Sequence, residues 1–268
     1  MKRTIYIIIA LVCMVGAIFC YSKVFRSTYA PAASRSEAYA PSETQEPSET
    51  ESKAATETET ETKETEAAYQ SPIDFEGLAE VNPDIYAWLR IPNTNIDFPV
   101  VQSAVNDQFY LDHNSDGEFS ANGAIFSEHV YNTKTFEDPV TLLYGHHMHD
   151  GAMMGRMQEY YTDADFFENN PTFTIYTPDG EYEYGVFAAV PYPGDHILYN
   201  HDFTDAQAYT GFFDEIMGIR DLSANFRQEY APEPGDKVVI LSTCLIADNR
   251  NRFLVMGKQL PAGQDGNQ

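Results

Sequence analysis

Three side chains have the chemistry of an acyl-transfer site: Cys244, Arg252 and, far from both in the sequence, His146. A cysteine thiolate attacks carbonyl carbons when a neighbouring base or cation stabilises it. A guanidinium stays charged at neutral pH and can donate hydrogen bonds to the oxyanion that this attack forms. An imidazole can give a proton to the leaving group and take one from the incoming group. The three residue types predict cysteine-dependent acyl transfer, provided that the fold brings them together.

Two strands are predicted to position the thiol and the guanidinium. The run 237–241 is apolar and β-branched, which is typical of a core strand, and the strand ends at Cys244. A second apolar run, 253–256, follows directly after Arg252. Because adjacent strands lie only about 5 Å apart, we expect the two side chains to share one small site. These residues alone leave open a buried structural cysteine and a solvated arginine.

Three histidines, His146, His147 and His149, follow the predicted strand 139–144. Loops at strand ends commonly carry catalytic groups. In an adjacent pair, the alternation of an extended chain sends one side chain towards a site and the other away from it. The cluster is therefore the expected source of the catalytic imidazole.

A metal site is the alternative interpretation of this histidine cluster. His147 and His149 would share a face if the strand continued, and Asp150 or His113 could complete a ligand set for a divalent ion. The sequence has no HExxH pattern, and Cys244 is the only cysteine outside the apolar N-terminal run. We therefore predict no metal at the site.

The N-terminal segment predicts a membrane anchor. Residues 5–21 carry no charge and are flanked by basic residues. At about 1.5 Å per residue, a helix of this length just crosses a bilayer core. A cleaved signal peptide is the alternative, although its apolar region is usually shorter and 30–33 only loosely matches a cleavage site. We expect residues 1–26 to form a cytoplasmic tip and a single transmembrane anchor, with the rest of the chain outside the cell.

Residues 27–70 are rich in Glu, Thr, Ser and Pro, and we expect them to form a disordered acidic spacer. The whole chain has 41 acidic and 16 basic residues, a net charge of −25, which argues against nucleic acid or an anionic lipid surface as a partner.

Residues 71–268 have the size of one domain. Of the three cysteines only Cys244 lies in that domain, and an unpaired thiol in an oxidising compartment favours a reactive role.

The domain is predicted to be mostly β with peripheral helices. Apolar spacing from Phe75 to Leu89 predicts two short helices joined at Pro83. Further helices are expected at 158–161, 163–169 and 205–219, and further strands at 96–102, 124–126, 172–176 and 181–191. Short strands with helices inserted between them favour a closed or nearly closed β-barrel over a doubly wound sheet.

The order His-Cys-Arg resembles that of the sortases, membrane-anchored cysteine transpeptidases of Gram-positive bacteria. YGHHM follows one strand, LSTC ends another, and an arginine stands eight residues after the cysteine. The resemblance covers 71–260 and includes YAWLRIPNTNIDFPVVQ, NDQFYLDHN, GAIFSE and GAMMGRM. The last motif, the N-terminal helices and the long helix 205–219 are most similar to class B sortases. The resemblance implies a sortase-like closed barrel that needs no cofactor.

The resemblance also implies roles for individual residues. Cys244 matches the nucleophile, His146 the catalytic histidine and Arg252 the catalytic arginine, with Arg250 as a nearby competitor for that last role. For substrate binding it implies Ser242, Leu198 and Tyr199, of which the last two lie in the loop before the long helix. One departure is that Leu245 and Ile246 follow the nucleophile where many class B members carry polar or aromatic residues, which leaves the shape of that subsite open.

The implied reaction is cleavage of a C-terminal sorting signal, NPxTx-like or LPxTG-like, of a surface protein through a thioacyl-enzyme. The acyl group would pass to an amine of a peptidoglycan precursor or of a pilin lysine. One alternative is another exported cysteine peptidase, but papain-like enzymes have the order Cys-His, and L,D-transpeptidases have Arg two residues after Cys, where Ile246 stands here. A stalked extracellular binding module with an inactive sortase-like domain is the non-enzymatic alternative.

Overall fold

The computed structural model describes residues 69–246, 248 and 250–261. The predicted anchor 1–26 and nearly all of the predicted spacer 27–70 lie outside the described residues. Within the described part, no helix has the length and apolar character needed to cross a membrane.

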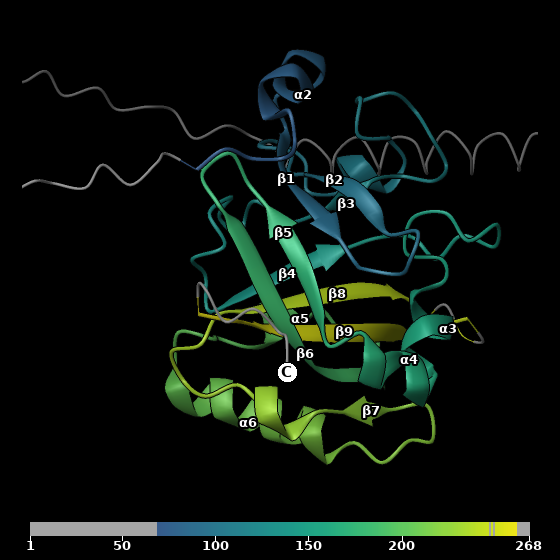
Figure 1. The fold of residues 1–268 in the computed structure, drawn as a ribbon, viewed down its shortest axis with the longest axis vertical. Helices are drawn as coiled ribbons and strands as arrows, with labels where there is room; N and C mark the ends of the chain where they lie inside the picture. The colour runs from purple at the N-terminus through teal and green to yellow at the C-terminus, as the bar shows by residue number, and fades with distance from the viewer. Residues whose placement is uncertain (1–68, 247, 249, 262–268) are drawn as a thin grey trace, which may run out of the picture. The chain divides into compact units, whose positions relative to one another are not determined.

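Eight strands of the described residues close into a barrel (Figure 1). Their order is β5-β1-β2-β3-β4-β8-β9-β6, and β6 pairs with β5 to close the ring. β2–β3 and β4–β8 are parallel, and the other pairs are antiparallel. The strands are β1 (Ile85–Arg90), β2 (Asp97–Val101), β3 (Ile125–Phe126), β4 (Val140–Tyr144), β5 (Thr172–Tyr176), β6 (Glu181–Tyr192), β8 (Val238–Cys244) and β9 (Arg252–Gln259), with the short β7 (Asn225–Phe226) paired to β6. The predicted closed, mostly β barrel is confirmed.

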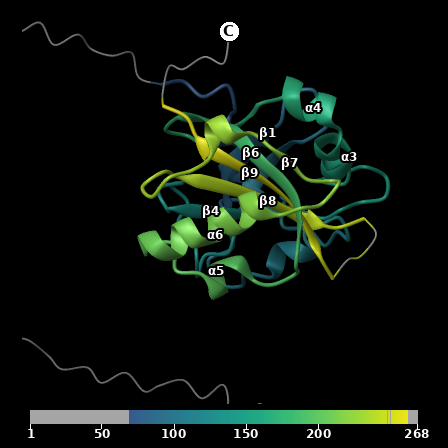
Figure 2. The ribbon, with the colours of Figure 1, turned by 90° about the horizontal axis from the view of Figure 1, so that it is seen from below.

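The helices lie at the periphery of the barrel, as the sequence predicts. They are α2 (Phe75–Val81), α3 (Met157–Thr162), α4 (Ala164–Asn169), α5 (Ile197–Asn200) and α6 (Ala206–Gly218), with 3-10 turns η1 (Phe109–Leu111) and η2 (Gln228–Tyr230). α6 is the predicted long helix before the cysteine strand, and Asp205 caps its N-terminus by accepting a hydrogen bond from the Ala208 amide. Figures 1 and 2 show α6 crossing the outer face of the sheet near β8 and β9.

The prediction of a second N-terminal helix is wrong, because Ile85–Arg90 forms strand β1. β1 lies between β2 and β5 and pairs with both. Ile85, Tyr86, Ala87 and Leu89 are all buried, so apolar residues occur on both faces of the strand. Their spacing then imitates the three- and four-residue spacing of a helix, and only the neighbouring strands decide between the two.

Two hydrophobic clusters on opposite faces of the sheet show which face each side chain of β8 occupies. On β8, Val239 and Leu241 belong to the cluster of the barrel interior. Val238 and Ile240 belong to the cluster that packs against α6. Successive side chains of a strand alternate between faces, so Cys244 lies on the same face of β8 as Ile240. Cys244 is the last residue of β8, and it follows the residues of that face that pack in the hydrophobic cluster. The uninterrupted apolar run of β8 follows from burial on both faces.

Candidate active site

The predicted nucleophile and the predicted catalytic arginine are direct neighbours across two antiparallel strands. Cys244 ends β8, Arg252 begins β9, and the two residues are paired in the register of the sheet. The Nη1 atom of Arg252 lies 3.9 Å from the Cys244 Sγ atom and donates to it. The predicted proximity of thiol and guanidinium is confirmed, and a negative charge on or beside the sulfur would be stabilised here.

The catalytic histidine predicted from the sequence reaches the same place from the neighbouring strand. β4 runs parallel to β8 with Tyr144 opposite Ser242. The Gly145 amide continues this pairing by donating to the Ser242 carbonyl at 3.0 Å. His146 is the next residue, and it lines one small cavity of about 80 Å³ together with Cys244 and Arg252. The other lining residues are Leu111, Phe126, Tyr144, Gly145, Ser242 and Thr243.

A backbone carbonyl orients the imidazole of His146. The Nε2 atom donates to the Leu111 carbonyl oxygen at 2.7 Å. Gly123 has φ +58°, and a Cβ there would lie 2.9 Å from both His146 Cδ2 and the Leu111 oxygen. The absence of a side chain at position 123 therefore lets this edge of the ring approach the η1 turn closely. With Nε2 occupied, Nδ1 is the ring nitrogen left to exchange a proton with a substrate.

The structure separates the two candidate arginines. Arg250 is exposed, and its Nε and Nη2 atoms form a two-point ion pair with the Asp248 carboxylate, each at 3.0 Å. This pair raises the pKa of Arg250 and lowers the pKa of Asp248, in both cases mainly through the side-chain hydrogen bonds. Arg252, not Arg250, lines the cavity that contains the thiol.

The predicted substrate-binding residues fall into two places. Ser242 is 4% exposed and lines the small cavity with the thiol. Leu198 and Tyr199 lie in α5 and line a separate cavity of about 480 Å³. That cavity also includes Tyr131 and contains none of the residues that line the first. The structure therefore brings Ser242, but not the α5 pair, to the cysteine, and the substrate-binding role of α5 stays a prediction.

The histidines considered as metal ligands do not converge. His147 and His149 are near each other, with ring centroids 6.0 Å apart. His113 instead stacks on Phe109 at 3.9 Å, and its Nδ1 contacts the neighbouring Asp112 carboxylate. Burial, and then the charge of His149, lowers the pKa of His147. Among the residues that the structure describes, no three acidic, histidine or cysteine side chains are arranged as a metal site.

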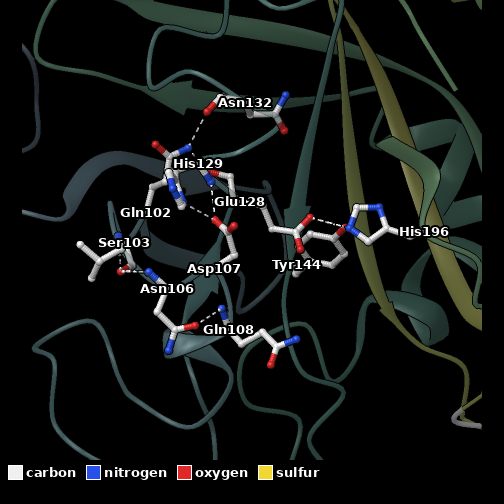
Figure 3. A network of polar contacts seen from close by, with 12 residues as sticks. Gln102, Ser103, Asn106, Asp107, Gln108, Glu128, His129, Asn132, Tyr144 and His196 are labelled. Atoms are coloured by element: carbon white, nitrogen blue, oxygen red, sulfur yellow. Dashed lines mark hydrogen bonds and ion pairs between the residues drawn. The ribbon is translucent and has the colours of Figure 1, made fainter. Parts of the chain in front are cut away.

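Sequence reasoning missed two polar residues beside the cavity. Tyr144 lines it, and its Oη donates to the Glu128 Oε2 atom at 3.1 Å. The same oxygen lies 2.9 Å from Nε2 of His196 (Figure 3). Burial, and then the charge of Glu128, raises the pKa of Tyr144, so its hydroxyl stays a donor. Tyr144 precedes the GHH motif directly, and Glu128 ends GAIFSE, so strand alternation around these motifs was the available signal.

The fold and the site are those of a cysteine-dependent acyl-transfer enzyme. A family model described as the sortase domain matches residues 89–260. Sortase B of Listeria monocytogenes serovar 1/2a is 32% identical over 187 residues, which cover 69% of this chain and 73% of that protein. The chain therefore belongs to the sortase family, and its relatives place it in class B.

Solved structures agree with this assignment. The X-ray structure of Clostridium perfringens sortase B has a TM-score of 0.61 and 26% identity, and the match covers 70% of this chain and all of that one. The Staphylococcus aureus sortase B–substrate complex has a TM-score of 0.61 and 27% identity, with 70% of this chain and 85% of that chain covered.

Proposed function

We propose that this chain cleaves a C-terminal sorting signal, NPxTx-like or LPxTG-like, of surface proteins and transfers the acyl group to an amine. The observation that carries the proposal is the cavity shared by the thiol of Cys244, the guanidinium of Arg252 and the imidazole of His146. The solved complex of the Staphylococcus aureus relative with a substrate supports a peptide substrate of this kind.

The reaction begins when the thiolate of Cys244 attacks the carbonyl carbon of the scissile amide and forms a tetrahedral oxyanion. Arg252 donates hydrogen bonds to this oxygen. The C–N bond breaks as protonated His146 gives its proton to the leaving amine, which leaves a thioester on the sulfur. The acceptor amine then attacks the thioester, its proton passes to neutral His146, and the thiolate of Cys244 is released.

The proposed acceptor is an amino group of a peptidoglycan precursor or of a pilin lysine. Both are primary amines that attack a thioester once the imidazole accepts their proton. The proposed location is the cell membrane, with residues 1–26 as a single anchor, the N-terminus inside and the catalytic domain outside. The uncharged run at 5–21 supports this location. Fractionation of cells, followed by protease treatment of intact protoplasts, tests it, and a chain that stays protected would contradict it.

Activity is tested with fluorescence-quenched peptides that carry varied sorting motifs, incubated with and without primary amines. We expect cleavage of at least one motif and an amide product with the added amine, both identified by mass spectrometry. The Cys244→Ala variant should lose both products and should form no thioester. Arg250→Ala is the matched control and should retain activity, because Arg250 is bound to Asp248 on the surface.

An inactive sortase-like binding module is the alternative, and thiol reactivity separates the two. A methanethiosulfonate reagent should label Cys244 rapidly, because the thiol lines an open cavity beside a cation. An intact protein that is neither labelled nor able to cleave any motif would support the binding module.

A further inference from the structure

The carboxylate of Glu128 joins three segments of the chain beside the cysteine cavity. Glu128 lies just after β3, and its side chain is 16% exposed. Its Oε2 atom accepts from Tyr144 at the end of β4 and pairs with His196 at the start of α5 (Figure 3). A carboxylate oxygen that is mostly shielded from water and has two donors forms stronger bonds than an exposed ion pair.

His196 uses its two ring nitrogens for different tasks. Nδ1 accepts from the Tyr199 amide at 3.2 Å and thereby caps the N-terminus of α5. Nε2 faces Glu128 at 2.9 Å, and the ring contacts Tyr131 with centroids 4.8 Å apart. Because Nδ1 acts as an acceptor, the proton lies on Nε2, and that N–H donates to the carboxylate. The residue therefore orders α5 and ties it to the neighbouring loop at the same time.

A second contact holds the connection between β6 and α6, residues 193–205, at the end of the barrel where Arg252 begins β9. β6 ends at Tyr192, which pairs with Arg252. At Gly194 an added Cβ would lie 1.9 Å from the Arg250 carbonyl oxygen and 3.9 Å from Nη1 of Arg252. The connection thus rests on the loop before β9 through Gly194 and on the loop after β3 through His196.

We propose that Glu128 and His196 are positioning residues for binding of the sorting peptide. Their pair fixes the 193–205 connection beside Arg252, next to the place where a peptide bound at Cys244 would lie, and Tyr144 links the pair to the cavity of the thiol. The pair touches none of the reacting atoms, so it acts on substrate binding more than on the chemical step. This inference rests on the proposed peptide substrate.

The test compares His196→Asn and Glu128→Ala with the wild type on the preferred sorting peptide. Asn can still cap α5 but is too short to reach Glu128, so His196→Asn removes the pair and keeps the cap. We expect each variant to raise KM about tenfold and to change kcat by less than about twofold. Glu128→Gln keeps an acceptor oxygen for both donors and should restore most of the affinity. An equal loss in kcat, or an unchanged KM, would overturn the inference.

His129→Asn is the matched control, because it breaks a similar pair in the same loop. Nδ1 of His129 lies 2.6 Å from Oδ1 of Asp107, and Figure 3 shows this pair apart from Tyr144 and His196. Its KM should remain that of the wild type. In the double variant Glu128→Ala/His196→Asn, KM should be no higher than in either single variant. Effects that multiply would show that the two residues act separately.

Amide hydrogen exchange tests the pair without any substrate. In Glu128→Ala the amides of 197–203 should exchange about fivefold faster than in the wild type, while those of β8 remain unchanged. Unchanged exchange at 197–203 would overturn the inference even in an active enzyme. If the wild type cleaves no sorting peptide, the proposed function fails, and the exchange result still decides whether the pair orders the connection.

Discussion

The backbone carbonyl of Leu111 accepts a hydrogen bond from Nε2 of His146 at 2.7 Å. A neutral carbonyl fills the place that a carboxylate occupies in a serine-protease triad, where it orients the ring and selects the tautomer. The orientation depends on the η1 turn, and two of the predictions below follow from it.

Gly123→Ala should lower kcat at least tenfold. The new Cβ would lie 2.6 Å from the Tyr110 carbonyl oxygen and 2.9 Å from the His146 ring, so the ring must move. A small displacement of a catalytic group is costly because proton transfer needs hydrogen-bond contact. Peptide cleavage measures the effect. Gly117→Ala is the control, since Gly117 also has positive φ, +81°, but nothing lies within 4 Å of its added Cβ. Equal losses in both variants would show that backbone strain, and not contact with the ring, is the cause.

Tyr110→Phe should loosen the η1 turn that carries Leu111. The Oη of buried Tyr110 donates to Asp84 at 2.8 Å and accepts from Asn82 at 2.8 Å. Its loss should lower the free energy of unfolding by about 1–3 kcal/mol and should also lower kcat, because the Leu111 carbonyl is less firmly placed. Denaturant unfolding measures the first effect. Tyr209→Phe removes a hydroxyl in the first turn of α6 that donates to the Asp236 carbonyl oxygen, and it should destabilise the protein but leave kcat unchanged.

Alkaline pH should destabilise the protein, with Tyr110 as one contributor. Burial raises the pKa of Tyr110 from 10.0 to about 12. A raised pKa means that the folded state keeps the proton where the unfolded state has lost it. The contribution is therefore complete below pH 10 and is lost as pH rises through about 12. Unfolding curves at pH 8 to 11 should show a declining free energy in the wild type and a shallower decline in Tyr110→Phe.

Arg252→Lys should lower kcat about 100-fold or more, although the charge is kept. An ammonium cannot present the planar fork of donors with which a guanidinium holds an oxyanion, and removal of one such donor typically costs about 100-fold to 1,000-fold. Arg250→Lys is the paired control and should stay within about twofold of the wild type. A greater loss in Arg250→Lys would instead assign the catalytic role to Arg250.

Arg227→Ala should destabilise the fold by about 1–3 kcal/mol for each buried carbonyl oxygen that is left without a donor, without a direct effect on the site. The Arg227 side chain is 8% exposed, and it donates to the carbonyl oxygens of Val186 at 2.8 Å and Phe167 at 2.6 Å. Its guanidinium also lies 4.6 Å from the centre of the Phe167 ring. Thermal unfolding measures the loss, with Arg220→Ala as the control, because exposed Arg220 donates to the Met217 and Ile219 carbonyl oxygens at the end of α6. A similar melting temperature for both variants would contradict the structural role of Arg227.

The strands near the site were largely predictable because their hydrophobic patterns are local. β8, β9 and the β5–β6 hairpin were found from apolar runs and turn residues, and the position of Cys244 beside Arg252 follows from the short connection between their strands. β1 was misassigned because burial on both faces removes the alternation that marks a strand. The sequence also does not predict that α5 lies away from the cysteine cavity, since loop conformation depends on contacts with distant segments.

The family, the β-barrel and the strand that carries the thiol can be predicted from the sequence alone, because each depends on contiguous residues or on their order. The contacts that hold the site residues in place form only in the folded chain. The Leu111 carbonyl reaches His146 from 35 residues away, and Glu128 ties the end of β4 to the start of α5. These contacts depend on which atoms the closed barrel brings within about 3 Å of each other, and no local period or motif specifies that distance.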